Sequence, residues 1–136
     1  MMNLIAGVNA TASALNAENI RMDVVAENIA NAYTTHGADG QPYKRKEVSF
    51  ESMLDPAGTG ENTVQVSQVA TDNTPGEMVF DPSNPDANKD GMVQMPNVNI
   101  STEMVDLMTS SRAYEANLAV IRNARQMASK ALTIGH

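Results

Sequence analysis

A continuous helical pattern fills residues 5–33, IAGVNATASALNAENIRMDVVAENIANAY. Residues recur along one stripe at alternating intervals of three and four, an average of 3.5, which keeps them on a single face of a helix. All but one of the stripe residues are apolar: Ile5, Val8, Ala12, Leu15, Asn19, Met22, Ala26, Ile29 and Tyr33. The spacing predicts a helix over about residues 3–33 that ends within residues 31–35, where Asn and paired Thr side chains compete for backbone hydrogen bonds.

The same spacing returns near the other end of the chain. Its positions are Ile100, Met104, Leu107, Ser111, Tyr114, Leu118, Ile121, Arg125, Ala128 and Leu132. A second long helix is predicted over residues 101–133, with Asn99 or Ser101 as its N-cap and Gly135 at its end. Asn19 and Arg125 are polar interruptions of the two stripes. Each either fixes the register of a coiled coil or faces solvent.

The middle of the chain reads as short strands and turns. Period-two alternation predicts a strand at residues 63–70, with Val64 and Val66 on one face. Further strands are expected at residues 43–50, 78–80 and 92–95, and residues 51–62 are expected to form a loop. The predicted fold is therefore mainly α with a small antiparallel β insert. It divides into an N-terminal assembly helix (1–35), a β-rich insert (36–98) and a C-terminal assembly helix (99–136).

Composition narrows the class of protein. The net charge is −7, and residues 34–98 hold ten acidic and four basic residues, which argues against binding to nucleic acid. The one basic cluster, residues 44–46, is expected to be a solvated strand face. With five aromatic residues and ten methionines, a large compact core is not expected. No apolar run is long enough for a transmembrane helix, so no membrane insertion is expected. We also expect no cleaved secretion signal.

One loop resembles a metal site. Residues 86–91, Asp-Ala-Asn-Lys-Asp-Gly, match the first half of a calcium-binding loop, but its twelfth position, where calcium loops place Glu, is Asn97. The alternatives are an interaction module that binds calcium through this loop and an ordinary Asp/Asn/Gly turn. His36 and His136 have no ligand-spaced neighbours, and no nucleophile, phosphate loop or acid–base set stands out. We therefore expect no catalytic residues, no metal and no cofactor.

Two helices with one apolar stripe each favour a protein that assembles. Isolated helices of this kind are marginal in water, because packing supplies most of their stability. We expect the helices to bury their stripes against neighbouring subunits as a coiled coil. The expected assembly interface comprises the stripe positions above, apart from Tyr33, Ser111 and Ala128.

Specific strings point to a family. Residues 21–32, RMDVVAENIANA, followed by Thr34-Thr35, resemble the N-terminal signature of the flagellar axial proteins. Residues 40–46, GQPYKRK, resemble the segment that follows it in rod members of the family. Residues 95–99, 103–108 and 111–117 (MPNVN, EMVDLM and SRAYEAN) resemble the C-terminal signature of a proximal rod protein.

This resemblance implies a structural, non-enzymatic subunit of the bacterial flagellar basal-body rod that is needed for motility. Members of the family leave the cytoplasm through the flagellar export apparatus without a cleaved signal. They stack helically with other rod proteins, with paired terminal helices inside and the insert outside. The resemblance thus implies self-assembly into a rod that spans the periplasm and transmits torque.

Overall fold

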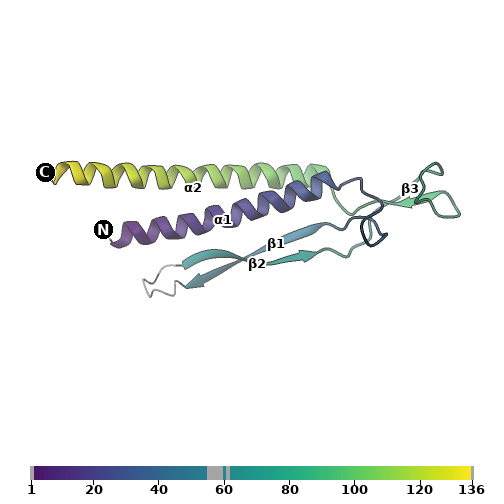
Figure 1. Cartoon of the computed structure of the whole chain (residues 1–136), viewed down its shortest axis with the longest axis horizontal. Coiled ribbons are helices and arrows are strands. Elements are labelled where there is room, and N and C mark those ends of the chain that lie inside the picture. The colour runs from purple at the N-terminus through teal and green to yellow at the C-terminus, as the bar shows by residue number, and fades with distance from the viewer. Residues whose placement is uncertain (1, 55–59, 61, 136) are drawn as a thin grey trace. The chain divides into compact units, whose positions relative to one another are not determined.

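Two long helices stand at the ends of the chain, with four strands between them (Figure 1). The computed structural model describes residues 2–54, 60 and 62–135. In chain order the elements are α1 (Met2–Ala30), β1 (Lys46–Leu54), β2 (Asn62–Thr71), β3 (Met78–Phe80), β4 (Met92–Gln94) and α2 (Ile100–Ile134). The predicted fold class, two terminal helices flanking a short antiparallel β region, is confirmed.

The chain forms two compact units, and each contains parts of both helices. The first unit comprises Met1–Met22, Ser49–Gln68 and Met108–His136. The second unit comprises Asp23–Val48 and Val69–Leu107. The sequence-based division into an N-terminal helix, an insert and a C-terminal helix follows the order of the chain and differs from these two units. It stays a prediction about how the segments act in assembly.

Side-chain hydrogen bonds define the inner ends of both helices. Helix α1 ends at Ala30, and the Asn31 amide then donates to the Glu27 carbonyl at 2.9 Å while the Thr34 hydroxyl donates to Asn31 Oδ1 at 3.2 Å. At the start of α2, Asn99 Oδ1 accepts the backbone N–H of Thr102 at 3.2 Å. Asn99 is therefore the N-cap. The start of α2 agrees with the sequence-based expectation, whereas α1 ends one residue before the predicted range of residues 31–35.

Strands β1 and β2 form a two-stranded sheet. The Thr63 hydroxyl donates to the Met53 carbonyl at 3.3 Å, and the Ser67 hydroxyl donates to the Ser49 carbonyl at 3.2 Å. Since the partner number falls as the β2 number rises, the strands are antiparallel. The prediction that residues 51–62 form a loop was wrong for residues 51–54, which extend β1, and for Asn62, which begins β2. Residues 55–59 and 61 lie outside the described residues.

The short strands β3 and β4 pair antiparallel in the second unit, with Val79 opposite Val93. Val93 is buried, whereas β3 is exposed along its length. Two glycines shape this region. Gly91 has φ +76°, a conformation that L side chains rarely adopt, and a Cβ on Gly76 would lie 1.9 Å from the Met95 carbonyl oxygen. Backbone segments therefore approach more closely here than any other residue would permit.

The described core is thin and consists of small side chains. Its buried apolar members are Ala17, Val24, Val25, Ala32, Val93 and Ala124. No aromatic residue is among them, and the absence of a large core in the described residues agrees with the expectation from composition. Small side chains let backbones approach closely but bury little apolar area, so each unit gains limited stability from its own packing.

Candidate assembly surface

The predicted stripe of α1 consists of half-buried and exposed positions that alternate along the helix. Within the subunit, Val8, Leu15, Met22 and Ile29 are half-buried, whereas Ile5, Ala12, Asn19 and Ala26 are exposed. The most buried positions of α1 are Ala17, Val24, Val25 and Asn28. The face of α1 that is buried within the subunit is therefore offset around the helix axis from the predicted stripe. Small Ala17 and the fully hydrogen-bonded Asn28 occupy it.

The predicted interface of α2 likewise divides into half-buried and exposed positions. Of its predicted interface positions, the half-buried ones are Ile100, Leu107, Tyr114, Leu118 and Ile121, and the exposed ones are Met104, Arg125 and Leu132. The innermost side chains are Glu103, Ser110 and Ala124. The assembly interface stays a prediction, and its exposed members are the part that is accessible to another subunit.

Large apolar side chains remain in contact with solvent on both helices. Ile5 is 62% exposed, Met104 53% and Leu132 64%, and all three belong to the predicted stripes. Outside the stripes, Val105, Met108, Val120, Met127 and Ile134 of α2 are also exposed. Exposed large apolar side chains on a helix are candidates for contact with another protein chain.

Asn19 and Arg125, the polar stripe residues that were predicted either to fix a register or to face solvent, are both exposed in this subunit. The buried polar residue of α1 is Asn28, at 1% exposure. Its Oδ1 accepts the Tyr43 hydroxyl at 2.8 Å and the Lys46 backbone N–H at 2.9 Å, and its Nδ2 donates to the Lys46 carbonyl at 2.9 Å. Nδ2 also donates to Glu103 Oε2 at 3.2 Å. All four hydrogen-bonding positions of the amide are therefore used.

Arg45 supplies the countercharge for this junction. Its guanidinium makes ion pairs with Glu103 and Glu47 and lies 3.9 Å from Asp106 Oδ2. The expectation of a solvated strand face at residues 44–46 was wrong for Arg45, whose side chain is 20% exposed. Burial alone would lower the pKa of Arg45, but hydrogen bonds and charge attraction from Glu103 and Glu47 outweigh it and raise that pKa. Glu103 has no exposed surface, so Arg45 is what makes its buried charge tolerable.

Tyr43 closes the junction on the β side. Its hydroxyl donates to Asn28, and its pKa is raised to about 12, first by burial and then by the negative charges of Glu27 and Glu103. The tyrosine therefore stays neutral over the physiological range. The junction of Asn28, Tyr43, Arg45, Lys46 and Glu103 joins α1, the start of β1 and α2 within the second unit.

Asn97 performs a similar task in the segment before α2. Its Oδ1 accepts the Arg45 backbone N–H at 2.7 Å, and its Nδ2 donates to the carbonyls of Asp72 and Thr74, each at 2.9 Å. The twelfth position of the calcium pattern is thus used to hold backbone segments together. The amide side chain of Asn97 therefore links three different backbone groups by hydrogen bonds.

The loop at residues 86–91 is organised by its own hydrogen bonds. Asn88 Oδ1 accepts the backbone N–H groups of Asp90 and Met92, an Asx-type turn. Asp86 accepts the Thr35 hydroxyl at 2.8 Å and lies 3.1 Å from His36 Nδ1. Within residues 2–54, 60 and 62–135, no group of three His, Cys, Asp or Glu residues could hold a metal ion. Nothing observed supports the calcium-binding alternative.

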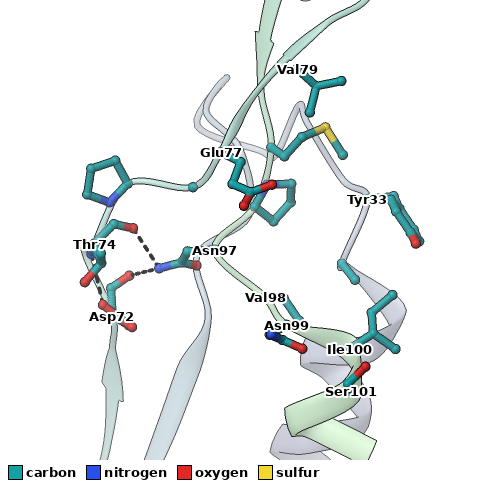
Figure 2. A pocket seen from close by; sticks show the side chains of 15 residues that line it. Tyr33, Asp72, Thr74, Glu77, Val79, Asn97, Val98, Asn99, Ile100 and Ser101 are labelled. Carbon is teal, nitrogen blue, oxygen red and sulfur yellow. Dashed lines mark hydrogen bonds between the residues drawn. The ribbon is translucent and has the colours of Figure 1, made fainter.

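A groove of about 590 Å³ lies beside the polar junction in the second unit (Figure 2). Apolar side chains line it from the turn after α1, from β3 and from the start of α2, and Asp72 and Glu77 belong to the same lining. The full set is Ala32, Tyr33, Asp72, Thr74, Pro75, Gly76, Glu77, Val79, Met95, Pro96, Asn97, Val98, Asn99, Ile100 and Ser101. Tyr33, the last residue of the first stripe, is 74% exposed at this groove.

Sequence reasoning missed the polar junction and the groove. A signal for Asn28 was present, because it continues the spacing of the buried Ala17 and Val24 by seven and then four residues. No local pattern paired Arg45 with Glu103, which lie 58 positions apart. In the described part of the chain, neither helix is long and apolar enough to cross a membrane.

Two family models match the chain. The model described as "Flagella basal body rod protein" matches residues 9–38. The model described as "Flagellar basal body rod FlgEFG protein C-terminal" matches residues 89–134. Together they cover most of α1 and all of α2, and the first also reaches the turns that follow α1.

Curated relatives match along nearly the whole chain. A protein of Bacillus subtilis named "Flagellar basal-body rod protein FlgC" is 41% identical over 98% of this chain and 99% of its own length. Proteins with the same name from Escherichia coli O6:H1 and Borreliella burgdorferi are 42% and 35% identical. These matches cover 90% and 98% of this chain and 91% and 98% of the relatives.

Proposed function

Since this chain belongs to the family of flagellar basal-body rod proteins and is a structural subunit of the rod, we propose that its two terminal helices bind neighbouring subunits through their exposed apolar side chains. The observation that carries the proposal is the exposure of Ile5, Met104 and Leu132, large apolar side chains at predicted stripe positions of α1 and α2. A folded monomer gains nothing from keeping them in water.

The free energy of burial favours this role. Each large aliphatic side chain moved from water into an interface contributes about 1.5–3 kcal/mol. Association costs translational and rotational freedom, so several such side chains must be buried together. The apolar positions of the two stripes supply that number. They also explain why the subunit itself needs only a thin core.

We also propose a position in the rod and a set of neighbouring proteins for this chain. We place the chain in the proximal rod, in a helical stack with other proximal and distal rod proteins that spans the periplasm and transmits torque through packed helices. The subunit reaches that position through the flagellar export apparatus without a cleaved signal. In this arrangement the helical segments 1–35 and 99–136 assemble, and the insert 36–98 lies outside them. The rod family is structural, and we propose no catalytic step for this chain.

The test is an exposed interface position changed to a charge. Leu132→Asp adds a carboxylate where solvent already reaches, so the monomer should fold with wild-type helix content by circular dichroism. In the assembly the charge would be desolvated, at a cost of several kcal/mol. A strain that carries only this variant should build no rods and should not swim.

Gln126→Asp is the matched control, because Gln126 is also exposed on α2 but lies outside the predicted stripe. It should swim normally. Wild-type motility and intact rods with Leu132→Asp would refute assembly through the α2 stripe.

A further inference from the structure

The groove in the second unit combines apolar walls with negative charge. Tyr33, Val79 and Ile100 contribute apolar surface, and Glu77 and Asp72 contribute carboxylates (Figure 2). Among the residues that the structure describes, no Lys, Arg or His lines it. A helix face that carries apolar side chains and a cation is complementary to this lining.

Both carboxylates belong to the lining of the groove. Glu77 is exposed, and no hydrogen bond or ion pair of its carboxylate occurs among the residues that the structure describes. Asp72 accepts the backbone N–H of Thr74 at 2.9 Å. Hydrogen bonds from Thr74 lower the pKa of Asp72.

The groove is also held in shape before anything binds. The Asn97 amide fixes the carbonyls of Asp72 and Thr74, and the Met95 backbone N–H donates to the Glu77 carbonyl at 2.8 Å. The close approach of Gly76 to Met95 keeps two of its walls together. A preformed groove spends little ordering entropy on binding.

The C-terminal part of α2 has the complementary charge. From residue 116 to residue 135 the chain contains three cations, Arg122, Arg125 and Lys130, and no acid. All three are exposed, and none forms an ion pair within the described chain. The last turn of α2 contains no base. Since a helix dipole acts mainly on its last turn, these cations are not placed there to complement it.

One face of this segment has the pattern that the groove requires. Its positions follow one another at intervals of three and four: Val120, Asn123, Met127, Lys130 and Ile134. We call this set the outer stripe. Val120 is 51% exposed, Met127 63% and Ile134 84%, and Lys130 lies between the last two. A helix with apolar anchors at such intervals is the usual occupant of an apolar groove.

We propose that the groove of one copy binds the outer stripe of α2 from a second copy, with Met127 and Ile134 against the apolar walls and Lys130 beside Glu77. The inference rests on the proposed function, because it supplies one specific contact of the assembly. The groove and the outer stripe are different surfaces, so the contact is heterologous. A heterologous contact that is repeated from copy to copy generates a ring or an open helical filament.

A cysteine cross-linking experiment tests the contact directly. The chain has no cysteine, so each introduced thiol is the only one. Full-length Ser101→Cys, at the groove, is mixed under oxidising conditions with single variants at Asn123, Met127 or Lys130. Because the two thiols are on different molecules, the mixed disulfide reports contact between copies. The expected result is a cross-linked heterodimer with at least one outer-stripe variant. The control variants Arg122→Cys and Gln126→Cys should yield clearly less. Equal yields from all positions, or no heterodimer, would overturn the proposal.

A charge swap provides the second readout. Glu77→Lys and Lys130→Glu should each weaken self-association of the full-length chain in sedimentation velocity by roughly three- to tenfold, because like charges then face each other. In an equimolar mixture of the two variants, the groove of either variant meets an opposite charge on the outer stripe of the other, so most of the lost association should be recovered. The loss should shrink at high salt. Arg122→Glu makes the same charge change on α2 outside the outer stripe and should have a smaller effect. Single variants that associate like wild type, or a mixture without recovery, would contradict the pairing.

The two proposals fail in different ways. If Leu132→Asp prevents rod formation while the swap and the cross-links show nothing, the terminal helices assemble but the groove is not their receptor. If Leu132→Asp also forms rods, the assembly surface itself is wrong.

Discussion

Replacement of Asn28 by Ala is the sharpest test of the polar junction. The change removes four hydrogen bonds: two to the Lys46 backbone, one to the Tyr43 hydroxyl and one to Glu103. Lys46 and Tyr43 are half-buried and can bind water that enters the space. Glu103 is fully buried and keeps only its pairing with Arg45.

The magnitude follows from these partners. An orphaned buried polar group costs about 1–3 kcal/mol, and water recovers part of that cost at the two half-buried residues. The higher helix propensity of Ala returns about 0.5 kcal/mol. We expect a net loss of roughly 2–4 kcal/mol in the free energy of unfolding, measured as a shift of the urea midpoint at unchanged slope.

Asn19→Ala is the matched control, because Asn19 lies on the same helix, is exposed and makes no hydrogen bond through its side chain in the described residues. It should stay within about 0.5 kcal/mol of wild type. If Asn28→Ala has the same small effect as Asn19→Ala, the junction does not stabilise the second unit and the reasoning fails. Asn28→Asp should destabilise further at neutral pH, since the new carboxylate would lie beside Glu103, and should recover as the pH falls and one of the two is protonated.

Three further predictions concern pH, calcium and the helix ends. Because the pKa of Tyr43 is raised to about 12 in the folded state, its contribution to stability is complete below the unfolded value of 10.0 and is lost as the pH rises toward about 12. Tyr43→Phe should therefore remove the phenolate absorbance that titrates near that pH and flatten the alkaline loss of stability. Asp90→Ala should leave the melting temperature nearly unchanged, because Asp90 is exposed and the turn depends on Asn88. Calorimetry of the wild-type protein with calcium should give no heat of binding. A calcium-dependent melting temperature that Asp90→Ala abolishes would reverse that conclusion. Amide hydrogen exchange of the free monomer should be fast near the N-terminus of α1 and the C-terminus of α2. It should be slow at residues 24–28, because this segment contains buried side chains and takes part in the polar junction. Uniformly slow exchange in both helices would contradict weak anchoring of their ends.

Local chemistry made much of the fold predictable. The spacing of apolar residues gave both helices to within a few residues, and Asn31, Thr34 and Asn99 marked their inner ends through hydrogen bonds that span at most four positions. The alternation of Val64 and Val66 likewise predicted β2. The end of β1 was misplaced, because whether residues 51–54 continue a strand depends on the hydrogen bonds of a neighbouring strand. That information is not contained in residues 51–54 themselves.

The sequence by itself determined the helical termini, the β insert, the family and the apolar stripes from which an assembly interface could be proposed. Only the tertiary structure decided which face of each helix is used within the subunit, because a 3.5-residue repeat describes a helix and not its neighbours. It brought Asn28, Arg45 and Glu103 into one junction and left Ile5, Met104 and Leu132 in solvent. The physical reason is that burial depends on which segments approach through space. A buried carboxylate such as Glu103 is acceptable only where a cation distant in sequence arrives beside it.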